Sequence, residues 1–378
     1  MIPPHRRMVE DLAGRGVLSP DWRSAFAAVP RHLFLPDVIA DADTGGRVDR
    51  EVDERGWMEA AYADAAVVTQ VDDGARHGPG EPTSSSPAPS AAAEAMRLLR
   101  AVPGMRVLEV GTGSGYGAAL LSHLLGDDAV VSVEIDFELA ERARIRLMSA
   151  GFTPLVVGGD GMQGWAGRAP YDRVVSAVAV RRVPYAWVAQ SRPGGRILTP
   201  WGNAFHHGAL ADLVVGPRGT AQGRFVGHAD CVWARADRAP RRLLETYVRA
   251  KPDHAATRIR LGPEDLLDDR DASFAVGLQM PGVYRRVRHT GEAGDPRVYL
   301  VDPATGSWAS WHAAPRHGES GHEVRQHGPR SLFTELEAAR LRWVEAGRPA
   351  YTRFGLTVSA EHQLVWLDDE DSVLASSG

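Results

Sequence analysis

Short apolar runs alternate with amphipathic stretches through the middle of the chain. The apolar runs predict five buried strands, at 106–110, 129–135, 154–159, 172–179 and 195–200. The stretches at 115–125 and 137–150 carry apolar residues at helical spacing. Strands that alternate with helices in this way are typical of βαβ units. The sequence therefore predicts an α/β fold with a parallel, doubly wound sheet.

The pattern changes on both sides of this central part. Residues 5–40 have helical spacing, and in the polar stretch that follows only 65–71 is predicted as a strand. Runs at 210–216 and 224–236 predict an antiparallel hairpin that closes one edge of the sheet. Beyond about residue 240, predicted strands and an amphipathic helix at 329–347 indicate an α+β module. We expect three parts: an N-terminal helical segment (1–104), the central domain (105–238) and the C-terminal module (239–378).

Composition and charge limit the classes of function. The 378 residues are 44% hydrophobic and 24% charged, which is ordinary for a globular protein. There are 43 Lys and Arg against 48 Asp and Glu, so no overall positive field would attract nucleic acid or an anionic membrane. The single cysteine, Cys231, excludes an internal disulfide and a multi-thiolate metal site. Since no run is apolar enough for a membrane span or a signal peptide, we expect a cytoplasmic protein.

A glycine-rich turn joins the first predicted strand to a helix, in the run VLEVGTGSGYG at 107–117. Gly111, Gly113 and Gly115 allow the backbone to approach a ligand closely, and the helix N-terminus presents free N–H groups. A dinucleotide site requires G-x-G-x-x-G, but the third glycine would fall at Tyr116. The observed G-x-G-x-G spacing favours a smaller ligand, S-adenosylmethionine.

Two acidic residues strengthen this prediction. Glu134 ends the second predicted strand, where an acidic residue would hold the ribose hydroxyls. Asp160 follows the third strand and is placed to accept a hydrogen bond from the adenine amino group. The alternative, a turn kept only for tight packing, is less favoured with both acids in register. The predicted cofactor-binding residues are Glu109, Gly111, Thr112, Gly113, Ser114, Gly115, Glu134, Ile135, Asp160 and Gly161.

Several segments closely resemble the protein-L-isoaspartyl O-methyltransferases, in the same order and spacing over residues 5 to about 235. They are VPRHLFLP (29–36), the turn at 107–117, VEIDFELAERAR (133–144), GDGMQGW (159–165), APYDRVVSAVA (169–179) and RPGGRILTPWG (192–202). The resemblance implies a Rossmann-like class I methyltransferase fold. It also implies a carboxyl methyltransferase that uses S-adenosylmethionine, releases S-adenosylhomocysteine and acts on a peptide or protein presenting Asp or isoaspartate. Gly111, Gly113, Glu134 and Asp160 match the family's cofactor positions.

The run GEPTSSSPAPS at 80–90 coincides with the substrate loop of that family, which usually reads like G-Q-T-I-S-Q-P. From composition alone this stretch would be a solvated linker. The resemblance instead makes Ser85, with Thr83 as helper, our candidate for positioning the substrate carboxylate through a hydroxyl donor. Ser176, after the fourth strand, lies at the sheet edge where ligands bind in such folds, and it is a third catalytic candidate or a core hydroxyl.

The chain also departs from the family pattern. Ser84 and Ser86 replace the Ile and Gln of the substrate loop, the segment at 41–79 is longer and more polar, and the C-terminal part is much longer. These departures resemble the variant methyltransferases that accompany ribosomally made, modified peptides, such as graspetides and lanthipeptides. The implied reaction is methylation of an Asp, followed by aspartimide or isoaspartate formation, with the C-terminal module as a possible peptide-binding part. Two alternatives are general repair of isoaspartate and a non-catalytic module that binds S-adenosylmethionine and captures a peptide.

Other motifs favour structure over chemistry. The run GTGSG is not a nucleophile elbow, because Thr112 and Tyr116 occupy positions that require glycine. Four histidines recur every five residues, a spacing that does not share one helix face, so a polar loop is favoured over a metal site: His312, His317, His322 and His327. We therefore expect no metal. Four tryptophans are interpreted as core of the C-terminal module, or alternatively as part of a peptide groove: Trp308, Trp311, Trp343 and Trp366.

Overall fold

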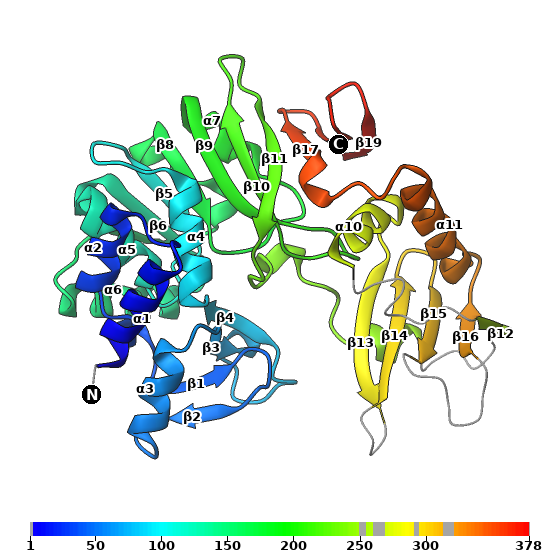
Figure 1. Cartoon of the computed structure of the whole chain (residues 1–378), viewed down its shortest axis with the longest axis horizontal. Helices are drawn as coiled ribbons and strands as arrows, with labels where there is room; N and C mark the ends of the chain where they lie inside the picture. Colours follow the sequence, from blue (N-terminus) through cyan, green and yellow to red (C-terminus); the bar gives the residue numbers. More distant parts are fainter. Residues whose placement is uncertain (1–2, 249–254, 260–268, 291–294, 313–320, 378) are drawn as a thin grey trace.

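The computed structural model describes residues 3–248, 255–259, 269–290, 295–312 and 321–377. Its strands form three sheets, of ten, four and five strands. Figure 1 shows the large sheet through the middle of the molecule, with the four-stranded sheet and the five-stranded sheet on either side below it. Among the described residues, no helix has the length and apolar character needed to cross a bilayer.

The ten-stranded sheet carries the predicted doubly wound core, in the order β19-β18-β17-β11-β10-β9-β8-β5-β6-β7. Its parallel strands are β5 (Val107–Val110), β6 (Val130–Glu134), β7 (Leu155–Gly158), β8 (Tyr171–Ser176) and β9 (Ser191–Trp201). Each of the five predicted strands is present. Because side chains alternate along a strand, neighbouring residues enter different cores. Val107 packs with the N-terminal helices, whereas Leu108 packs on the opposite face.

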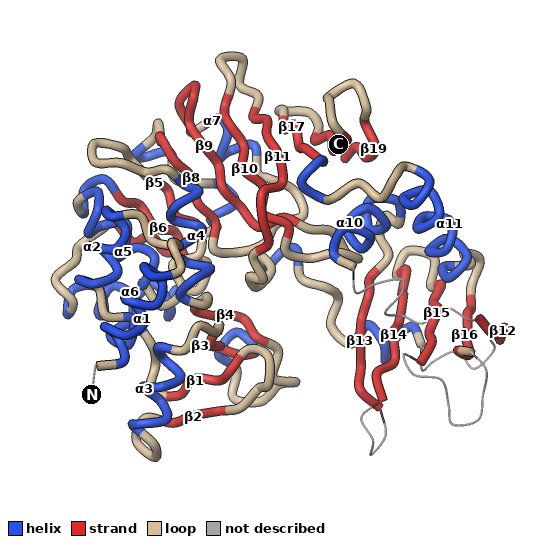
Figure 2. The backbone as a smooth tube through the Cα atoms, viewed as in Figure 1, coloured by secondary structure: helices blue, strands red, loops and turns tan. Residues whose placement is uncertain are grey.

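Helices cover both faces of this sheet, as Figure 2 shows. On one face lie α1 (Pro4–Gly14), α2 (Pro20–Ala28), α4 (Pro89–Leu99), α5 (Tyr116–Leu125) and α6 (Phe137–Ser149). The other face is covered by α7 (Tyr185–Ala189) and α10 (Arg270–Gln279), whose Trp187 and Phe274 are fully buried. Short 3-10 turns connect the elements: η1 (Arg31–Phe34), η2 (Asp72–Gly74), η3 (Asp127–Ala129), η4 (Gly161–Gln163), η5 (Ala166–Arg168), η6 (Arg235–Asp237) and η7 (Tyr351–Arg353).

The predicted hairpin forms β10 (Ala209–Val215) and β11 (Ala221–His228), which pair antiparallel with each other. It does not close the sheet edge. Strand β17 (Phe354–Val358) pairs with β11, and β18 (Gln363–Leu367) and β19 (Val373–Ser377) follow outside it. The end of the chain therefore completes the ten-stranded sheet.

The four-stranded sheet is antiparallel, in the order β2-β1-β3-β4. Its strands are β1 (Val38–Asp41), β2 (Arg47–Asp49), β3 (Val67–Val71) and β4 (Pro82–Ser86), and α3 (Glu54–Tyr62) packs beside them. Only β3 was predicted here, and the compositional reading of 78–90 as a linker is wrong for β4. Ser84 and Ser86 of β4 are buried, and their hydroxyls form hydrogen bonds with Thr69 and Arg31. Because the buried residues of this strand are polar, the sequence lacks the alternation of apolar and polar residues that predicts a strand.

The five-stranded sheet has the order β12-β16-β15-β14-β13. Its elements are β12 (Ala255–Ile259), β13 (Tyr284–Thr290), β14 (Asp295–Asp302), β15 (Ser307–His312) and β16 (His322–His327), with α8 (Leu243–Tyr247) and α11 (Leu332–Glu345) packed against it. The four tryptophans singled out in the sequence are buried. Trp308 and Trp311 belong to this sheet, whereas Trp366 lies in β18. The part expected at 239–378 thus contributes to two sheets.

Candidate active site

A cavity of about 750 Å³ lies where the parallel strands β5, β6 and β8 end. Ligands bind at this edge in doubly wound sheets, and the volume falls in the range of small-molecule sites. The glycine-rich turn lines it, together with Glu134, β4 and the segment 228–236. The cavity therefore joins the predicted cofactor turn to the predicted substrate loop.

The glycine-rich turn has a backbone that favours glycine. The φ angles of Gly111, Gly113 and Gly115 are +89°, +53° and +93°. A Cβ at Gly111 would lie 3.1 Å from Cγ1 of Val178, and one at Gly113 would lie 3.5 Å from Oγ of Ser84. The turn therefore packs directly against the predicted substrate loop. Gly115 does not line the cavity but packs on the face of α6.

Glu134 is held by backbone donors at the end of β6. The N–H of Gly113 donates to its Oε2 at 2.8 Å, and the N–H of Asp136 donates to its Oε1 at 3.0 Å. Burial raises the pKa of this carboxyl, and the two hydrogen bonds oppose the shift. The carboxylate is therefore fixed at the cavity wall, where the sequence predicts a ribose contact.

Glu109 is buried beneath the same turn. The hydroxyl of Ser132 donates to its Oε2 at 2.6 Å, and the hydroxyl of Thr112 lies 2.6 Å from that of Ser132. Burial raises the pKa of Glu109 to about 7. This chain of polar groups connects the start of the turn to β6.

The remaining predicted cofactor residues also reach the cavity. They are Thr112, Ser114, Ile135, Asp160 and Gly161. The Asp160 side chain caps η4 by accepting the N–H of Met162 at 3.0 Å, and it is exposed. Gly161 lies so close to Val110 that a Cβ would be 2.6 Å from Cγ1 of that residue. An open backbone turn, an anchored carboxylate and an exposed acid at this edge fit an adenosine-containing cofactor.

The three hydroxyl candidates differ in what they contact. Thr83 Oγ1 donates to Gln70 at 2.8 Å and accepts the N–H of Asp73 at 3.0 Å. Ser176 Oγ donates to the carbonyl of Val178 at 2.7 Å, within its own turn. Ser85 is half-buried, lines the cavity and makes no side-chain hydrogen bond within the described residues. Of the three, Ser85 has the hydroxyl that is available to a ligand.

Sequence reasoning assigned no role to Arg31, although it holds the substrate loop. Its side chain is fully buried and donates to the carbonyls of Ala61 at 2.7 Å, Pro87 at 2.9 Å and Ser86 at 3.2 Å. Burial lowers the pKa of Arg31 to about 10, so the side chain is still a cation at neutral pH. The only indication in the sequence was a charged residue inside the apolar segment 29–36. Its partners are backbone carbonyls, which every residue has, so the sequence does not identify them.

A second contact fixes the substrate loop from the other side. Asp73, in the turn between β3 and β4, accepts Arg238 at 2.7 Å and Arg235 at 3.1 Å. Both arginines line the cavity and belong to the segment that leaves β11. These ion pairs therefore connect the segment that carries both arginines to the β3–β4 hairpin, which carries Ser85.

The sequence predicts no metal site at the four regularly spaced histidines, and the structure describes only some of these residues. His317 lies outside the described residues, and the side chain of His312 is likewise not described. His322 is buried, and His327 stacks on Trp308 with ring centroids 6.1 Å apart. Among the described residues, no group of three or more His, Cys, Asp or Glu side chains could hold a metal ion.

A family model described as Protein-L-isoaspartate(D-aspartate) O-methyltransferase matches residues 4–212, which is more than half of the chain. The chain belongs to this family. Protein-L-isoaspartate O-methyltransferases are carboxyl methyltransferases that use S-adenosylmethionine, and this chain is an enzyme of that class.

Individual members of the protein-L-isoaspartate O-methyltransferase family match the same part of the chain. The protein from Methanothermobacter thermautotrophicus is 35% identical over 206 residues, which cover 54% of this chain and 82% of that one. The protein from Thermococcus onnurineus is 36% identical over 199 residues, which cover 52% and 76%. A solved structure named protein-L-isoaspartate O-methyltransferase covers 97% of this chain and 100% of its own, at 22% identity and a TM-score of 0.56. That likeness shows the fold.

Proposed function

We propose that this methyltransferase methylates the side-chain carboxylate of an Asp in a ribosomally made peptide, and that the ester then gives an aspartimide or isoaspartate. The observation that carries the proposal is the available hydroxyl of Ser85, on a strand that packs against the glycine-rich cofactor turn. Carboxylate and cofactor would meet between these two elements. Thr83 and Ser176 support the site by shaping its walls.

The chemistry demands alignment more than acid–base catalysis. A side-chain carboxyl has a pKa of about 4, so it is an anion at neutral pH and needs no general base. S-adenosylmethionine, held by the turn with Glu134 and Asp160, supplies an electrophilic methyl group when bound. Ser85 would donate a hydrogen bond to one carboxylate oxygen and leave the other free to attack. Arg31 is turned away toward backbone carbonyls, so it does not overstabilise the anion.

Methylation prepares the next bond. The methoxy group of the ester is a far better leaving group than the oxide that a carboxylate would have to expel, so the backbone amide nitrogen that follows the Asp can attack the ester carbonyl carbon. The C–N bond forms, the C–O bond breaks and the amide proton leaves with methoxide as methanol. This closure to a succinimide needs no further group from the protein.

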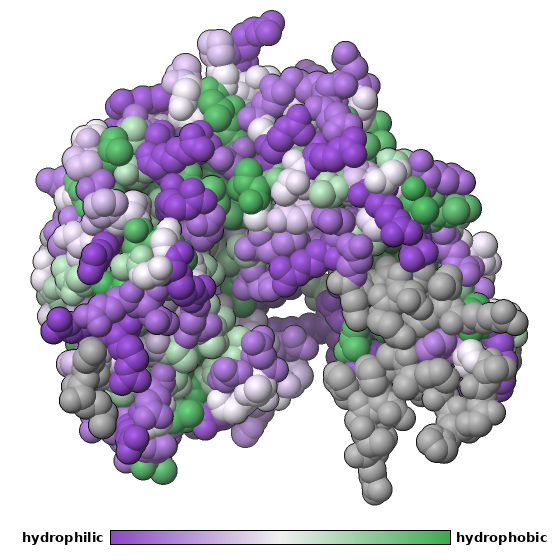
Figure 3. Space-filling model, viewed as in Figure 1, coloured by the Kyte–Doolittle hydropathy of each residue, from purple (hydrophilic) through white to green (hydrophobic). Residues whose placement is uncertain are grey.

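Two parts of the molecule support a shaped peptide as substrate. The segment 41–79 contributes α3 and the strands β2 and β3 to the region beside the substrate strand β4. The five-stranded sheet lies wholly outside the matched residues 4–212. Figure 3 shows an opening on this face beside the part that holds the four-stranded sheet, with mainly hydrophilic residues above it. We expect a site with these additional elements to favour a folded or cyclised peptide over an unstructured one.

The second candidate is general repair of isoaspartate. The matched relatives are all named protein-L-isoaspartate O-methyltransferases, and the matched residues include β4. A third candidate, a non-catalytic module that captures a peptide, is separated from the other two by any transfer of a labelled methyl group.

Substrate choice is tested with labelled S-adenosylmethionine and three peptides: an isoaspartyl peptide, its Asp isomer, and a candidate precursor, which is a short peptide encoded by a gene that neighbours this one. We expect a methyl ester on an Asp of the precursor, followed by loss of methanol in the mass spectrum. Efficient turnover of the isoaspartyl peptide, with no activity on the precursor, would contradict peptide maturation and support repair.

Replacing Ser85 with alanine should slow methyl transfer about tenfold to a hundredfold, the effect of one hydrogen bond to a charged group. The affinity for S-adenosylhomocysteine should stay nearly unchanged, because Ser85 is assigned to the substrate. Ser85→Thr keeps a hydroxyl and should retain most of the rate. Equal rates for wild type and Ser85→Ala would remove Ser85 from the reaction.

A further inference from the structure

Two arginines from distant parts of the chain meet at the ring of Tyr284. Arg181 follows β8, and Arg286 lies on β13 of the five-stranded sheet, as does Tyr284. The guanidinium carbon of Arg181 is 4.9 Å from the centre of the Tyr284 ring, and that of Arg286 is 5.9 Å from it. Arg181 also lies 5.3 Å from the ring centre of Trp233. The rings hold both cations at the junction of the two large sheets.

Neither arginine has an ion-pair partner within the residues that the structure describes. A guanidinium has five N–H donors, and each of these two makes one side-chain hydrogen bond there, Arg181 to the Tyr284 hydroxyl and Arg286 to the carbonyl of Arg285. The Nε of Arg181 is buried without an acceptor. The unused donors leave both half-buried guanidiniums able to bind an anion.

The nearby acidic residues do not neutralise the pair. Asp237 accepts the backbone N–H of Arg181 at 2.9 Å rather than its guanidinium. Glu81 is close enough to raise the pKa of Arg286, but burial is the larger influence and the net shift is downward. By contrast, Arg288, two residues further along β13, pairs with Glu245 at 3.0 Å. Within the described residues, Arg181 and Arg286 therefore lack the carboxylate partner that Arg288 has.

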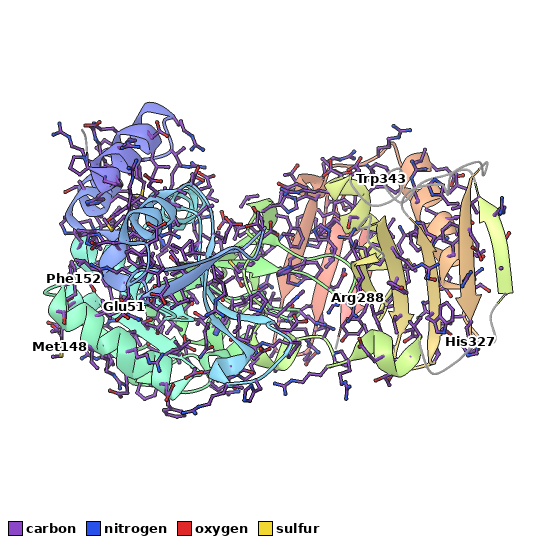
Figure 4. The ribbon with its side chains drawn as sticks, turned by 90° about the horizontal axis from the view of Figure 1, so that it is seen from below. Glu51, Met148, Phe152, Arg288, His327 and Trp343 are labelled. Carbon is purple, nitrogen blue, oxygen red and sulfur yellow. The ribbon has the colours of Figure 1, made fainter. Side chains whose placement is uncertain are left out.

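The pair lies beside the active-site cavity. Trp233, which Arg181 covers, is part of the cavity wall, and Glu81 directly precedes the substrate strand β4. Figure 1 shows β13 as the strand of its sheet nearest the rest of the molecule, and Figure 4 shows Arg288 on that side, with His327 on the far side. A peptide with one carboxylate at Ser85 could thus extend toward Arg181 and Arg286.

We propose that Arg181 and Arg286 form a second carboxylate-binding subsite, which takes an anionic group of the peptide other than the one that is methylated. A planar guanidinium matches a carboxylate through two parallel N–H donors, and two guanidiniums can share one anion. The enzyme would then select acidic peptides. This inference rests on the proposed function, and it adds that the peptide substrate is acidic. The anion is either a Glu or Asp side chain or the peptide's C-terminal carboxylate.

The test uses labelled synthetic peptides with a central Asp, and it measures their binding to the S-adenosylhomocysteine-loaded enzyme by fluorescence anisotropy. One peptide has glutamates on both sides, and a second has glutamines there. Each is made with a free and an amidated C-terminus, which separates the two sources of the anion. We expect wild type to bind an anionic peptide about tenfold more tightly than the neutral amidated one. Arg181→Gln and Arg286→Gln should each remove most of that preference.

Arg288→Gln is the matched control, because it makes the same change on the same strand at an arginine that already has a partner. It should leave the preference intact. Thermal melting and cofactor affinity identify any variant that fails to fold. If Arg181→Gln fails to fold, Arg286→Gln alone carries the test. Equal binding of all peptides to wild type, no binding of any, or a preference that survives in folded variants at both positions would overturn the subsite. Methyl transfer measured in parallel reports on the proposed function separately.

Discussion

Replacing Glu134 with alanine should weaken the binding of S-adenosylhomocysteine about 100-fold or more, since hydrogen bonds to a charged group contribute about 1.5–3 kcal/mol each. The carboxylate accepts the N–H groups of Gly113 and Asp136, so it orders the glycine-rich turn, and we propose that it also binds the ribose. Both contributions disappear together in the alanine variant. Isothermal titration calorimetry with S-adenosylhomocysteine measures the change directly.

Glu138→Ala is the control for Glu134→Ala. Glu138 lies on the first turn of α6 and pairs with Arg142 on the exposed side of the helix. The affinity of this variant should match that of wild type. A folded Glu134→Ala variant that still binds with wild-type affinity would show that the turn, and not this acid, determines cofactor binding.

Arg31→Met should lower the free energy of unfolding by about 2–4 kcal/mol, because it leaves several buried carbonyls without a donor. The substitution keeps much of the apolar volume but frees the main chain at Ser86 and Pro87. Since these residues follow Ser85, the KM for the peptide should rise even where the variant remains folded. Urea unfolding gives the stability, and steady-state kinetics below the transition give the KM.

Two further variants show whether the effect belongs to the Arg31 contacts. Arg31→Lys keeps the charge but has fewer, differently arranged donors, so it should recover only part of the lost stability. Arg23→Met makes the same change on the exposed side of α2 and should stay within about 0.5 kcal/mol of wild type. Equal stability of Arg31→Met and wild type would mean that the loop is held by β-pairing alone.

The parallel core was predictable because its strands are buried on both faces. Such strands read as continuous apolar runs, and the predicted 106–110 and 129–135 became Val107–Val110 and Val130–Glu134. The cofactor turn was equally visible, because glycine spacing and the acid at the end of β6 follow from the geometry of one βα unit. Local sequence carries both signals.

The rest depended on partners far away in the chain. Strand β4 is made of Pro, Thr and Ser, and its burial comes from hydrogen bonds to Arg31 and Thr69, which composition does not encode. Strand β17 looked like part of a separate module, because its pairing with β11 is set by tertiary packing. Arg181 and Arg286 are more than a hundred residues apart, so no spacing rule could join them.

The pairing of β17 with β11 also limits how far this enzyme can be truncated. A gene shortened after residue 238 would leave β11 with a row of unpaired N–H and C=O groups along its outer side. The same cut would remove Phe354, Leu356 and Val358 from the apolar interior on that face. Such a fragment would tend to associate through its bare edge. The last strands of the chain therefore cover β11 and move the edge of the sheet outward to β19, and a minimal catalytic version would have to retain or replace them.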